Sequence, residues 1–464
     1  MELTANPTLE ITELNNSTHL LIQPGRSLFG AISSNGLHGI PGDKSISHRA
    51  ALFSALAEGI SRIENFQVSG VTRPMLDALT AVGVDWDLDG THLTVEGKGL
   101  LQGDRPPQPI NCGNSATTLR LLAGGLASLG VEAILDGSVG LRRRPMQRIV
   151  EPMKQMGVSI QATDGCAPLT LHACSYPLHG IAHSLQVASA QVKSCLLLAG
   201  LIADSPTIIY EPGPSRDHTE RMLSSMGVDL SVSRMIGNEG YGYSTCIKTS
   251  PDKTLKPLHM NLPGDFSAAA FLIVSACITP GSAITLQGVG LNPTRTGLLD
   301  VLRNMGAKIT ISDLSEQGGE PVGTLNVSTS ELEGCLVEGE LVVRMIDEFP
   351  IFAIAAAFAS GKTEVRDASE LRHKESDRIT ALCQELRKIG VKVEEKSDGF
   401  VISGGRPVGG SVQAHGDHRL AMSLAVAGLA SEGVIMINHP GIIAESFPGF
   451  VHILKFLGGD LVLL

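Results

Sequence analysis

One pattern recurs six times along the chain and limits the possible folds more than any other feature. It is a polar segment, carrying Gly, Ser or Asp, that leads into an Ala-rich helical run. The copies start about 70 to 85 residues apart, which is longer than most solenoid repeats. The six copies lie at 41–59, 113–130, 189–203, 263–281, 347–361 and 416–433. The spacing favours six small α/β subdomains over the alternative, a solenoid.

The same secondary structure is predicted after each copy. A short strand-like run follows the helix, then a second amphipathic helix, then a pair of alternating strands such as 391–395 with 399–403. The second helices are predicted at 73–82, 144–156, 217–226, 294–305, 376–389 and 447–457. A glycine follows each of them, which is typical of a helix C-terminus: Gly83, Gly157, Gly227, Gly306, Gly390 and Gly458.

Six such units in 464 residues exceed one ordinary core and divide naturally into two lobes of three. We therefore predict an α/β (α+β) protein in which residues 43–262 form one lobe. Residues 20–42 and 263–464 would form the other lobe, so that two strands of chain link the lobes. Residues 1–19 would be an N-terminal extension.

Composition excludes several classes of function. The net charge of −11 argues against nonspecific nucleic-acid binding as the main role, and it makes local basic clusters more informative. The eight cysteines lack zinc-site spacing and give no reason to expect a disulfide framework or a bound metal. No apolar run is long enough to span a membrane, and the first sixteen residues lack the pattern of a signal peptide. We expect a cytoplasmic protein.

The first repeat carries the pattern of an anion-binding site. Lys44 stands at the entrance of the predicted helix, and Ser45 and Arg49 share one helix face because they are four residues apart. Unpaired N–H groups and the positive helix end attract anions to such a place. A capped helix with a solvated lysine would explain this segment equally well when it is taken alone.

The next two repeats add polar groups at their helix entrances. Residues 114–120 read Asn-Ser-Ala-Thr-Thr-Leu-Arg, and Ser189 is followed by Ala190 and Gln191. Within the arginine run 142–144, the first two are interpreted as a solvated patch. Arg144, ahead of Pro145 at a predicted helix start, is better placed to bind a carboxylate or phosphate through two hydrogen bonds.

The second half of the chain contributes acids beside further cations. Asp347 opens the fifth repeat, Glu375 lies between Lys374 and Arg378, and Arg419 follows Asp417 and His418 in the sixth. Acids in a first helical turn are often only partners of the helix dipole, and a charged helix face could explain either cluster alone. Together the clusters favour a shared site for two small anionic substrates, in which Asp347 and Glu375 transfer protons.

Six motifs, taken together, carry a family resemblance over about residues 20–464. The chain resembles the enolpyruvyl transferases, and most closely the EPSP synthases. The motifs are Pro-Gly-Asp-Lys-Ser (41–45), Gly-Asn-Ser-Ala-Thr-Thr-x-Arg (113–120), Arg-Pro-Met (144–146), Ser-Ala-Gln (189–191), Lys-Glu-Ser-Asp-Arg (374–378) and Gly-Asp-His-Arg (416–419). The resemblance implies two lobes, each of three βαβαββ units, joined by a two-stranded hinge.

The resemblance also implies a reaction. It is the transfer of the enolpyruvyl group from phosphoenolpyruvate to the 5-hydroxyl of shikimate 3-phosphate, by addition and elimination, with release of phosphate. No metal or cofactor is implied, and the expected form is a monomer that binds neither nucleic acid nor membrane. Closure of the lobes would exclude water from the reacting groups.

Site residues follow from the resemblance by motif. Shikimate 3-phosphate would be bound by Lys44, Ser45, Arg49, Ser189, Ala190, Gln191, Ser215, Asp347 and Lys374. Phosphoenolpyruvate would be bound by Lys44, Gly113, Ala116, Arg144, Gln191, Arg378 and Arg419. The catalytic residues implied are Lys44, Asp347 as the base at the 5-hydroxyl, and Glu375 as the proton donor to the methylene carbon.

The chain departs from the family pattern at two positions. Glu445 stands before Ser446-Phe447-Pro448, where many members have Lys before Phe-Pro, so one phosphate contact is missing or is supplied elsewhere. Ala116 stands where herbicide-sensitive members have Gly, and its methyl group should crowd the bulkier phosphoenolpyruvate mimic glyphosate.

Three alternative functions were weighed against this one. A UDP-N-acetylglucosamine enolpyruvyl transferase would have Asn after its Lys, where this chain has Ser45, and a reactive Cys in the loop 136–144, which has none. An RNA 3′-phosphate cyclase would need a nucleotide-linked His and a more basic surface. A catalytically silent binding protein would tolerate the loss of Asp347 or Glu375.

Overall fold

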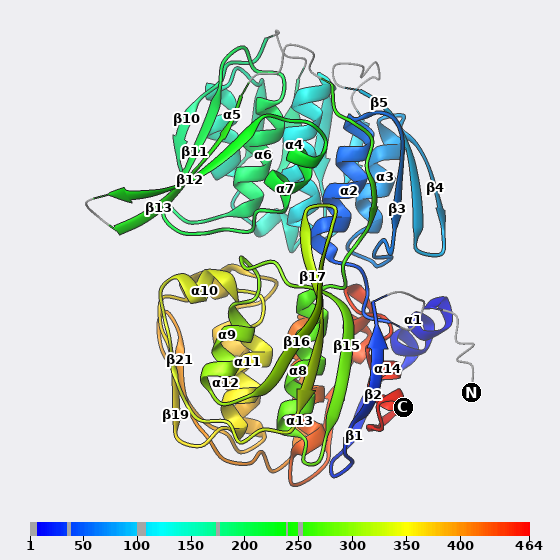
Figure 1. Ribbon diagram of the computed structural model, residues 1–464, viewed down its shortest axis with the longest axis vertical. Coiled ribbons are helices and arrows are strands. Elements are labelled where there is room, and N and C mark those ends of the chain that lie inside the picture. The colour runs from blue at the N-terminus through cyan, green and yellow to red at the C-terminus, as the bar shows by residue number, and fades with distance from the viewer. Residues whose placement is uncertain (1–6, 35–38, 100–107, 173–176, 238–239, 249–253) are drawn as a thin grey trace. The chain divides into compact units, whose positions relative to one another are not determined.

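The computed structural model describes residues 7–34, 39–99, 108–172, 177–237, 240–248 and 254–464 (Figure 1). These residues form two compact units. Unit 2 comprises Asp43–Leu262 together with the four residues Gln317–Glu320. Unit 1 comprises Pro263–Glu316, Pro321–Leu464 and the described residues up to Gly42. The chain thus passes from one unit to the other after Gly42 and again after Leu262.

Each unit contains three four-stranded sheets among its described residues. In unit 2 the strand orders are β14 (His259–Asn261)-β3 (Glu58–Glu64)-β5 (His92–Lys98)-β4 (Asp85–Asp89), β6 (Gln108–Asn111)-β7 (Ala133–Asp136)-β9 (Cys166–Leu171)-β8 (Ile160–Thr163), and β10 (Ala182–Ser184)-β11 (Thr207–Glu211)-β13 (Gly240–Ile247)-β12 (Leu230–Gly237). The first two strands of each order are parallel. In the second and third orders a helix connects these two strands, and this connection allows them to run in parallel. The later pairs are antiparallel.

Unit 1 repeats this plan. Its orders are β2 (Phe29–Ser33)-β15 (Ala283–Gly290)-β17 (Glu320–Ser328)-β16 (Lys308–Gln317), β18 (Leu336–Val337)-β19 (Lys362–Val365)-β21 (Phe400–Ser403)-β20 (Lys392–Glu395), and β22 (Gly410–Gln413)-β23 (Ile435–Asn438)-β1 (His19–Gln23)-β24 (Asp460–Leu463). The N-terminal strand β1 therefore completes the sheet of the last repeat by pairing with β23 and β24.

Two strands are exchanged where the chain passes between the units. Strand β2 precedes the first repeat helix but pairs with β15, which follows the fourth. Strand β14 precedes the fourth repeat helix but pairs with β3, which follows the first. Unit 1 is consequently built from stretches of chain that lie on both sides of Asp43–Leu262 in the sequence.

The twelve predicted helices are all present. The Ala-rich helices are α2 (Lys44–Leu56), α4 (Ala116–Leu129), α6 (Ala190–Gly200), α8 (Phe266–Ile278), α11 (Phe349–Phe358) and α13 (His418–Ala430). The second helices are α3 (Arg73–Ala81), α5 (Gln147–Gln155), α7 (His218–Ser225), α9 (Gly297–Asn304), α12 (Arg378–Lys388) and α14 (Phe450–Phe456). All six glycines predicted at the C-termini of the second helices have positive φ, between 83° at Gly83 and 112° at Gly458, which confirms that prediction.

Five further helical segments complete the described secondary structure, and the first of them was not predicted from the sequence. Helix α1 (Pro7–Asn16) falls within the predicted N-terminal extension, and its Leu14 is buried in the core of unit 1. The others are η1 (Leu141–Arg143), α10 (Glu340–Arg344), η2 (Ser369–His373) and η3 (Pro440–Glu445).

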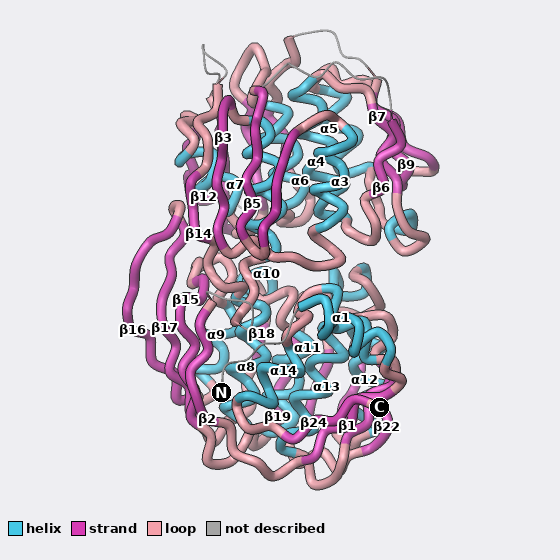
Figure 2. Tube along the Cα trace, turned by 90° about the vertical axis from the view of Figure 1, so that its right-hand side faces the viewer, coloured by secondary structure: helices cyan, strands magenta, loops and turns pink. Residues whose placement is uncertain are grey.

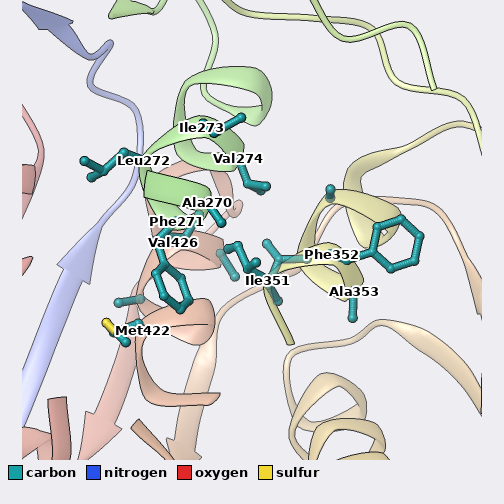
Figure 3. Packing of buried hydrophobic residues seen from close by; sticks show 14 of the residues in the cluster. Ala270, Phe271, Leu272, Ile273, Val274, Ile351, Phe352, Ala353, Met422 and Val426 are labelled. Atoms are coloured by element: carbon teal, nitrogen blue, oxygen red, sulfur yellow. The ribbon is translucent and has the colours of Figure 1, made fainter. Parts of the chain in front are cut away.

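The Ala-rich helices form the centre of each unit, with the sheets outside them (Figures 1 and 2). In unit 1, Phe271 and Val274 of α8 lie among buried side chains of α11 and α13, such as Ile351 and Met422 (Figure 3). In unit 2, a Cβ atom at Gly124 of α4 would lie 2.2 Å from the carbonyl oxygen of Cys195 in α6. This close approach requires glycine, and it brings the entrances of neighbouring helices together.

Candidate active site

In unit 2, the side chain of Arg49 connects three helices. Its Nε donates to Thr219 Oγ1 of α7 at 2.7 Å, and its Nη2 donates to Ser194 Oγ of α6 at 2.8 Å. Its Nη1 donates to the carbonyl oxygen of Ser45 in α2 at 3.0 Å, which confirms that Ser45 and Arg49 share a helix face. Burial lowers the pKa of Arg49 to about 10, so the side chain remains a cation at neutral pH.

The entrance of α2 is fixed by a cap. Asp43 accepts a hydrogen bond from the backbone N–H of Ile46 at 2.9 Å, as expected for an N-cap aspartate. Lys44 is the first helical residue and is half-buried. Behind it, the Nδ1 atom of His48 lies 2.7 Å from the carbonyl oxygen of Lys44. Burial lowers the pKa of His48 to about 4, so that ring is neutral at physiological pH.

Ser215 and Arg216, which precede α7, lie close to the same group. Arg216 Nη1 lies 3.4 Å from Ser45 Oγ, and the Ser215 hydroxyl donates to Glu211 Oε1 at 2.5 Å. Glu211 is neutralised in turn by the buried Lys193, at 2.7 Å. Lys193 also pairs with Glu220 at 2.6 Å, so its positive charge is compensated by two buried carboxylates.

The entrances of α4 and α6 are joined by a second set of polar contacts. Arg120 is buried, and it donates to Gln191 Oε1 at 2.6 Å and to the carbonyl oxygen of Pro145 at 3.1 Å. Gln191 donates to Thr117 Oγ1 at 2.8 Å. Arg120 is therefore a buried residue whose hydrogen bonds connect the entrances of α4 and α6. Ala116, the first residue of α4, is 3% exposed.

The prediction that Arg144 stands at a helix start is wrong. Helix α5 begins three residues later, at Gln147, and Arg144 has extended backbone angles of φ −83° and ψ 137°. The physical reason is Pro145, whose ring disfavours helical angles in the preceding residue. Arg144 is half-buried, whereas Arg142 is exposed and paired with Asp136 at 2.8 Å, in agreement with its interpretation as surface.

In unit 1, Arg378 forms ion pairs with the acidic residues predicted for the site. Its side chain is 3% exposed and lies 2.7 Å from Asp417, 2.7 Å from Glu375 and 3.5 Å from Asp347. Burial disfavours its charge, but the carboxylates of Asp417, Glu375 and Asp347 outweigh burial and raise the pKa of Arg378 above its ordinary value. Lys374 adds a second cation, with Nζ 3.7 Å from Asp347 Oδ1.

Lys374 and Glu375 lie ahead of the helix that carries Arg378. Helix α12 begins at Arg378, and Lys374 lies in an extended backbone conformation after η2. Asp377 caps α12 by accepting from the backbone N–H of Thr380 at 3.1 Å, which places Lys374 and Glu375 ahead of the helix. The two residues still reach Arg378 and Asp347 through their side chains.

Arg419, in the first turn of α13, lies on the other side of Asp347. Its Nη1 donates to the backbone carbonyl oxygen of Asp347 at 3.2 Å and lies 3.7 Å from Glu348 Oε1. Glu348 is only 1% exposed and accepts a short hydrogen bond from Ser267 Oγ. Asp347, Lys374, Glu375, Arg378 and Arg419 thus form one group in unit 1.

The predicted site residues accordingly fall into two groups, one in each unit. The unit 2 group contains Ser45, Arg49, Gln191 and Ser215, with Lys44, Ala116, Arg144, Ser189 and Ala190 on the same helix entrances or adjoining loops. Gly113 precedes α4 and has a φ of 58°. Thr219 and Ser194 were not identified from the sequence, because buried polar residues within helices give no signal of their partners.

Three further findings concern other sequence predictions. No helix in the described part of the chain is long and apolar enough to cross a membrane. Among the described residues, no group of three or more His, Cys, Asp or Glu side chains is arranged to hold a metal ion. The described cysteines form no disulfide bond with one another, and Cys174 lies outside the described residues.

Comparison with known proteins identifies the family. A model of the family "EPSP synthase (3-phosphoshikimate 1-carboxyvinyltransferase)" matches residues 34–454. The chain belongs to the EPSP synthase family. A 3-phosphoshikimate 1-carboxyvinyltransferase of Acidithiobacillus ferrooxidans is 45% identical over 93% of this chain and 96% of its own length. One of Desulforamulus reducens is 45% identical over 94% of this chain and 98% of its own.

Solved structures agree with this membership. The EPSP synthase of Acinetobacter baumannii superposes with a TM-score of 0.84 at 36% identity, covering 97% of this chain and all of that one. The α/β fold class with six four-stranded sheets is therefore confirmed, as is the resemblance to EPSP synthases. The chain is a transferase of the shikimate pathway, and the comparisons give no support to the UDP-N-acetylglucosamine alternative.

The ion pair of Asp417 with Arg378 leads to a prediction about stability. Replacing Asp417 with asparagine leaves Arg378 as a buried cation with less compensation, which should lower the free energy of unfolding by about 3 to 5 kcal/mol at pH 7. Urea unfolding measures it. Asp229→Asn, which alters an exposed pair with Lys248, should change that free energy by no more than about 0.5 kcal/mol. Equal unfolding free energies for the two variants would contradict the prediction.

The same pair determines a dependence on pH. Burial opposes ionisation of Asp417, but Arg378 outweighs burial and lowers the pKa of Asp417 below its ordinary value. Its stabilising effect is therefore complete above the ordinary value, about pH 4, and is lost as the pH falls through the lowered pKa. Between these limits, the wild type should lose stability more steeply with acid than Asp417→Asn does.

Proposed function

We propose that this chain transfers the enolpyruvyl group of phosphoenolpyruvate to the 5-hydroxyl of shikimate 3-phosphate, and that both groups of site residues take part in this one reaction. Membership of the EPSP synthase family supports the reaction. The observation that carries the residue assignments is Arg378, a buried guanidinium that holds Asp347 and Glu375 within 3.5 Å of one cation. Such a cluster offers proton donors and acceptors beside positive charge.

The unit 2 group is proposed to bind shikimate 3-phosphate. Arg49 and Ser45 at the entrance of α2 suit its phosphate, because a cation, a hydroxyl and a helix N-terminus coincide there. Ser189 and Ala190 begin α6, and Ser189 makes no capping hydrogen bond with its side chain. Its hydroxyl is thus available to a substrate. Gln191 and Ser215 complete this group, and Lys374 and Asp347 of unit 1 are assigned to the same substrate.

Phosphoenolpyruvate is proposed to bind the remaining cations. Lys44, Arg144, Arg378 and Arg419 supply four cations for its phosphate and carboxylate, although Arg378 is shared with the carboxylates of Asp347, Glu375 and Asp417. Gly113, Ala116 and Gln191 would line the same place at the entrances of α4 and α6. Guanidinium groups suit this role because they bind carboxylate and phosphate oxygens through paired hydrogen bonds.

Two proton transfers are assigned to the carboxylates. Asp347 takes the proton of the 5-hydroxyl as its oxygen attacks the enolpyruvyl carbon, and Glu375 donates a proton to the methylene carbon. In the elimination, the bond between the transferred carbon and the phosphate oxygen breaks, Glu375 takes a proton back from the methyl group as the double bond re-forms, and Asp347 gives its proton to the departing phosphate. Lys44 stabilises the negative charge that develops on the transferred group. The enzyme is proposed to act as a monomer in the cytoplasm, without a cofactor.

Phosphate release tests the proposed function. Release is expected only when shikimate 3-phosphate and phosphoenolpyruvate are present together, and it should be accompanied by stoichiometric formation of enolpyruvylshikimate 3-phosphate. Each substrate is omitted in turn as a control. Release that requires one substrate alone, or neither, would refute the assignment.

Ala116 leads to a prediction about inhibition. Its methyl group is buried at the first residue of α4, where a phosphoenolpyruvate mimic larger than the substrate would be crowded. Glyphosate should therefore inhibit the wild type weakly, and Ala116→Gly should bind it about 10- to 200-fold more tightly, the usual range for one methyl group. Inhibition constants against phosphoenolpyruvate measure this effect. Tight and equal inhibition of both proteins would contradict the prediction.

A further inference from the structure

Two buried hydroxyl groups behind Arg49 are not explained by the roles assigned so far. Thr219 in α7 and Ser194 in α6 are both fully buried, at 0% exposure. They accept the hydrogen bonds of Arg49 Nε and Nη2, at 2.7 and 2.8 Å. They also contact each other, with 2.6 Å between their hydroxyl oxygens. One edge of the guanidinium is therefore hydrogen-bonded to two hydroxyl groups that are also hydrogen-bonded to each other.

The contacts fix the direction of every hydroxyl proton in this group. Ser194 Oγ lies 2.5 Å from the carbonyl oxygen of Ala190, which can only accept, so the Ser194 proton points there. The Thr219 proton must then point to Ser194 Oγ. Both hydroxyl oxygens are left with lone pairs facing Arg49, whose N–H groups can only donate. The opposite direction would leave the Thr219 proton without an acceptor among the described residues and the Ala190 carbonyl without this donor.

This chain of hydrogen bonds joins three helices of unit 2. It runs from Arg49 in α2 through Thr219 in α7 and Ser194 in α6 to Ala190, the first residue of α6. Together with the bond to the Ser45 carbonyl, it uses three of the five N–H groups of Arg49. One N–H on each terminal nitrogen has no acceptor among the described residues, and these two suit an anion.

We propose that Thr219 and Ser194 are positioning residues for shikimate 3-phosphate, because they fix the orientation of the Arg49 guanidinium and of the α6 entrance toward the substrate's phosphate. This inference rests on the proposed function. The two residues do not touch the substrate, and they act only through Arg49 and Ala190. Their effect is therefore specific to one of the two substrates.

Removal of each hydroxyl tests the inference. Thr219→Val and Ser194→Ala should each weaken the Kd for shikimate 3-phosphate, measured by calorimetry, by about 10-fold or more, as expected for a lost hydrogen bond to a charged group. The KM for phosphoenolpyruvate should change by less than about 2-fold, since Arg49 is assigned to the other substrate. Thr219→Ser, which keeps the hydroxyl, should restore the affinity.

The chain offers matched controls for the loss of a buried hydroxyl. Thr207 in β11 and Ser54 in α2 are also 0% exposed, and within the described residues their hydroxyl oxygens have no hydrogen-bond partner. Thr207→Val and Ser54→Ala should leave the Kd for shikimate 3-phosphate unchanged. Circular dichroism and thermal melting establish that each variant is folded. If Thr219→Val does not fold, Ser194→Ala, which removes one oxygen atom, tests the same contact.

A double variant separates positioning from general damage. If Thr219 acts through Arg49, then Arg49→Lys combined with Thr219→Val should bind shikimate 3-phosphate no more weakly than Arg49→Lys alone. Additive losses, or losses equal to those of the controls, would overturn the inference. These results differ from failure of the proposed function, in which wild-type protein itself would show no binding of shikimate 3-phosphate and no substrate-dependent phosphate release.

Discussion

Replacing Lys44 with methionine is expected to lower kcat/KM by about a thousandfold or more, which corresponds to a loss of about 4 kcal/mol of transition-state stabilisation. Lys44 is the first residue of α2 and so stands at a helix N-terminus, which already favours negative charge. It is assigned to both substrates, and methionine keeps the length of the side chain while it removes the charge. Steady-state rates of phosphate release measure the effect.

Lys98→Met is the matched control for Lys44→Met. Lys98 belongs to the same unit, but it is half-exposed, and its polar contacts lie at the surface: Asp85 at 3.7 Å and the carbonyl oxygen of Gly83 at 2.9 Å. Its replacement should change kcat/KM by less than about 2-fold, since surface ion pairs of this kind contribute little. Turnover of Lys44→Met within tenfold of the wild type would remove Lys44 from the catalytic residues.

The second large effect is expected at Glu375. Glu375→Gln keeps the shape of the side chain and can still accept from Arg378, which lies 2.7 Å away. It cannot donate and regain a proton at the methylene carbon, so kcat should fall by about a hundredfold to ten-thousandfold, the usual contribution of a general acid. The KM for phosphoenolpyruvate should change much less, because Arg144, Arg378 and Arg419, which are assigned to this substrate, are retained. Single-turnover measurements of the chemical step give the comparison.

Glu394→Gln provides the control for Glu375→Gln. Glu394 lies on β20, is exposed and pairs only with its surface neighbour Lys396. Its replacement should leave kcat unchanged. A Glu375→Gln enzyme with near-normal kcat would show that another group donates the proton, and Asp347, 3.5 Å from Arg378, would be the next candidate.

Much of the fold could be predicted because its information is local. The positive φ of Gly83, Gly157 and the four equivalent glycines follows from their place after amphipathic helices. Asp43 and Asp417 cap α2 and α13 as expected for residues of this type at helix starts. The exact starts of α5 and α12 were less predictable. Pro145 delays the start of α5 to Gln147, and the cap at Asp377 sets the start of α12 at Arg378.

The composition of the two groups of site residues could be predicted only in part. Arg49 and Arg378 were recognised as cations at helix entrances, and Asp347 and Glu375 were expected in the same site as Arg378, but Thr219 and Asp417 were not recognised as partners. Thr219 is 170 residues from Arg49 in sequence, and Asp417 is 39 from Arg378. Such pairs depend on which helix entrances are packed side by side. In unit 2 that depends on Gly124, where α4 and α6 approach closely enough to exclude any other side chain.

The sequence by itself determined the six repeats, the helix entrances rich in anion-binding groups, and the motifs that mark an EPSP synthase, because periodicity, capping and residue type are properties of short segments. Only the tertiary structure decided that β1 completes the last sheet and that β2 and β14 exchange partners. It also decided that hydroxyls of α6 and α7 orient Arg49, and that one buried arginine collects Asp347, Glu375 and Asp417. Burial is the reason, since a charge removed from water must find its partners wherever the fold brings them.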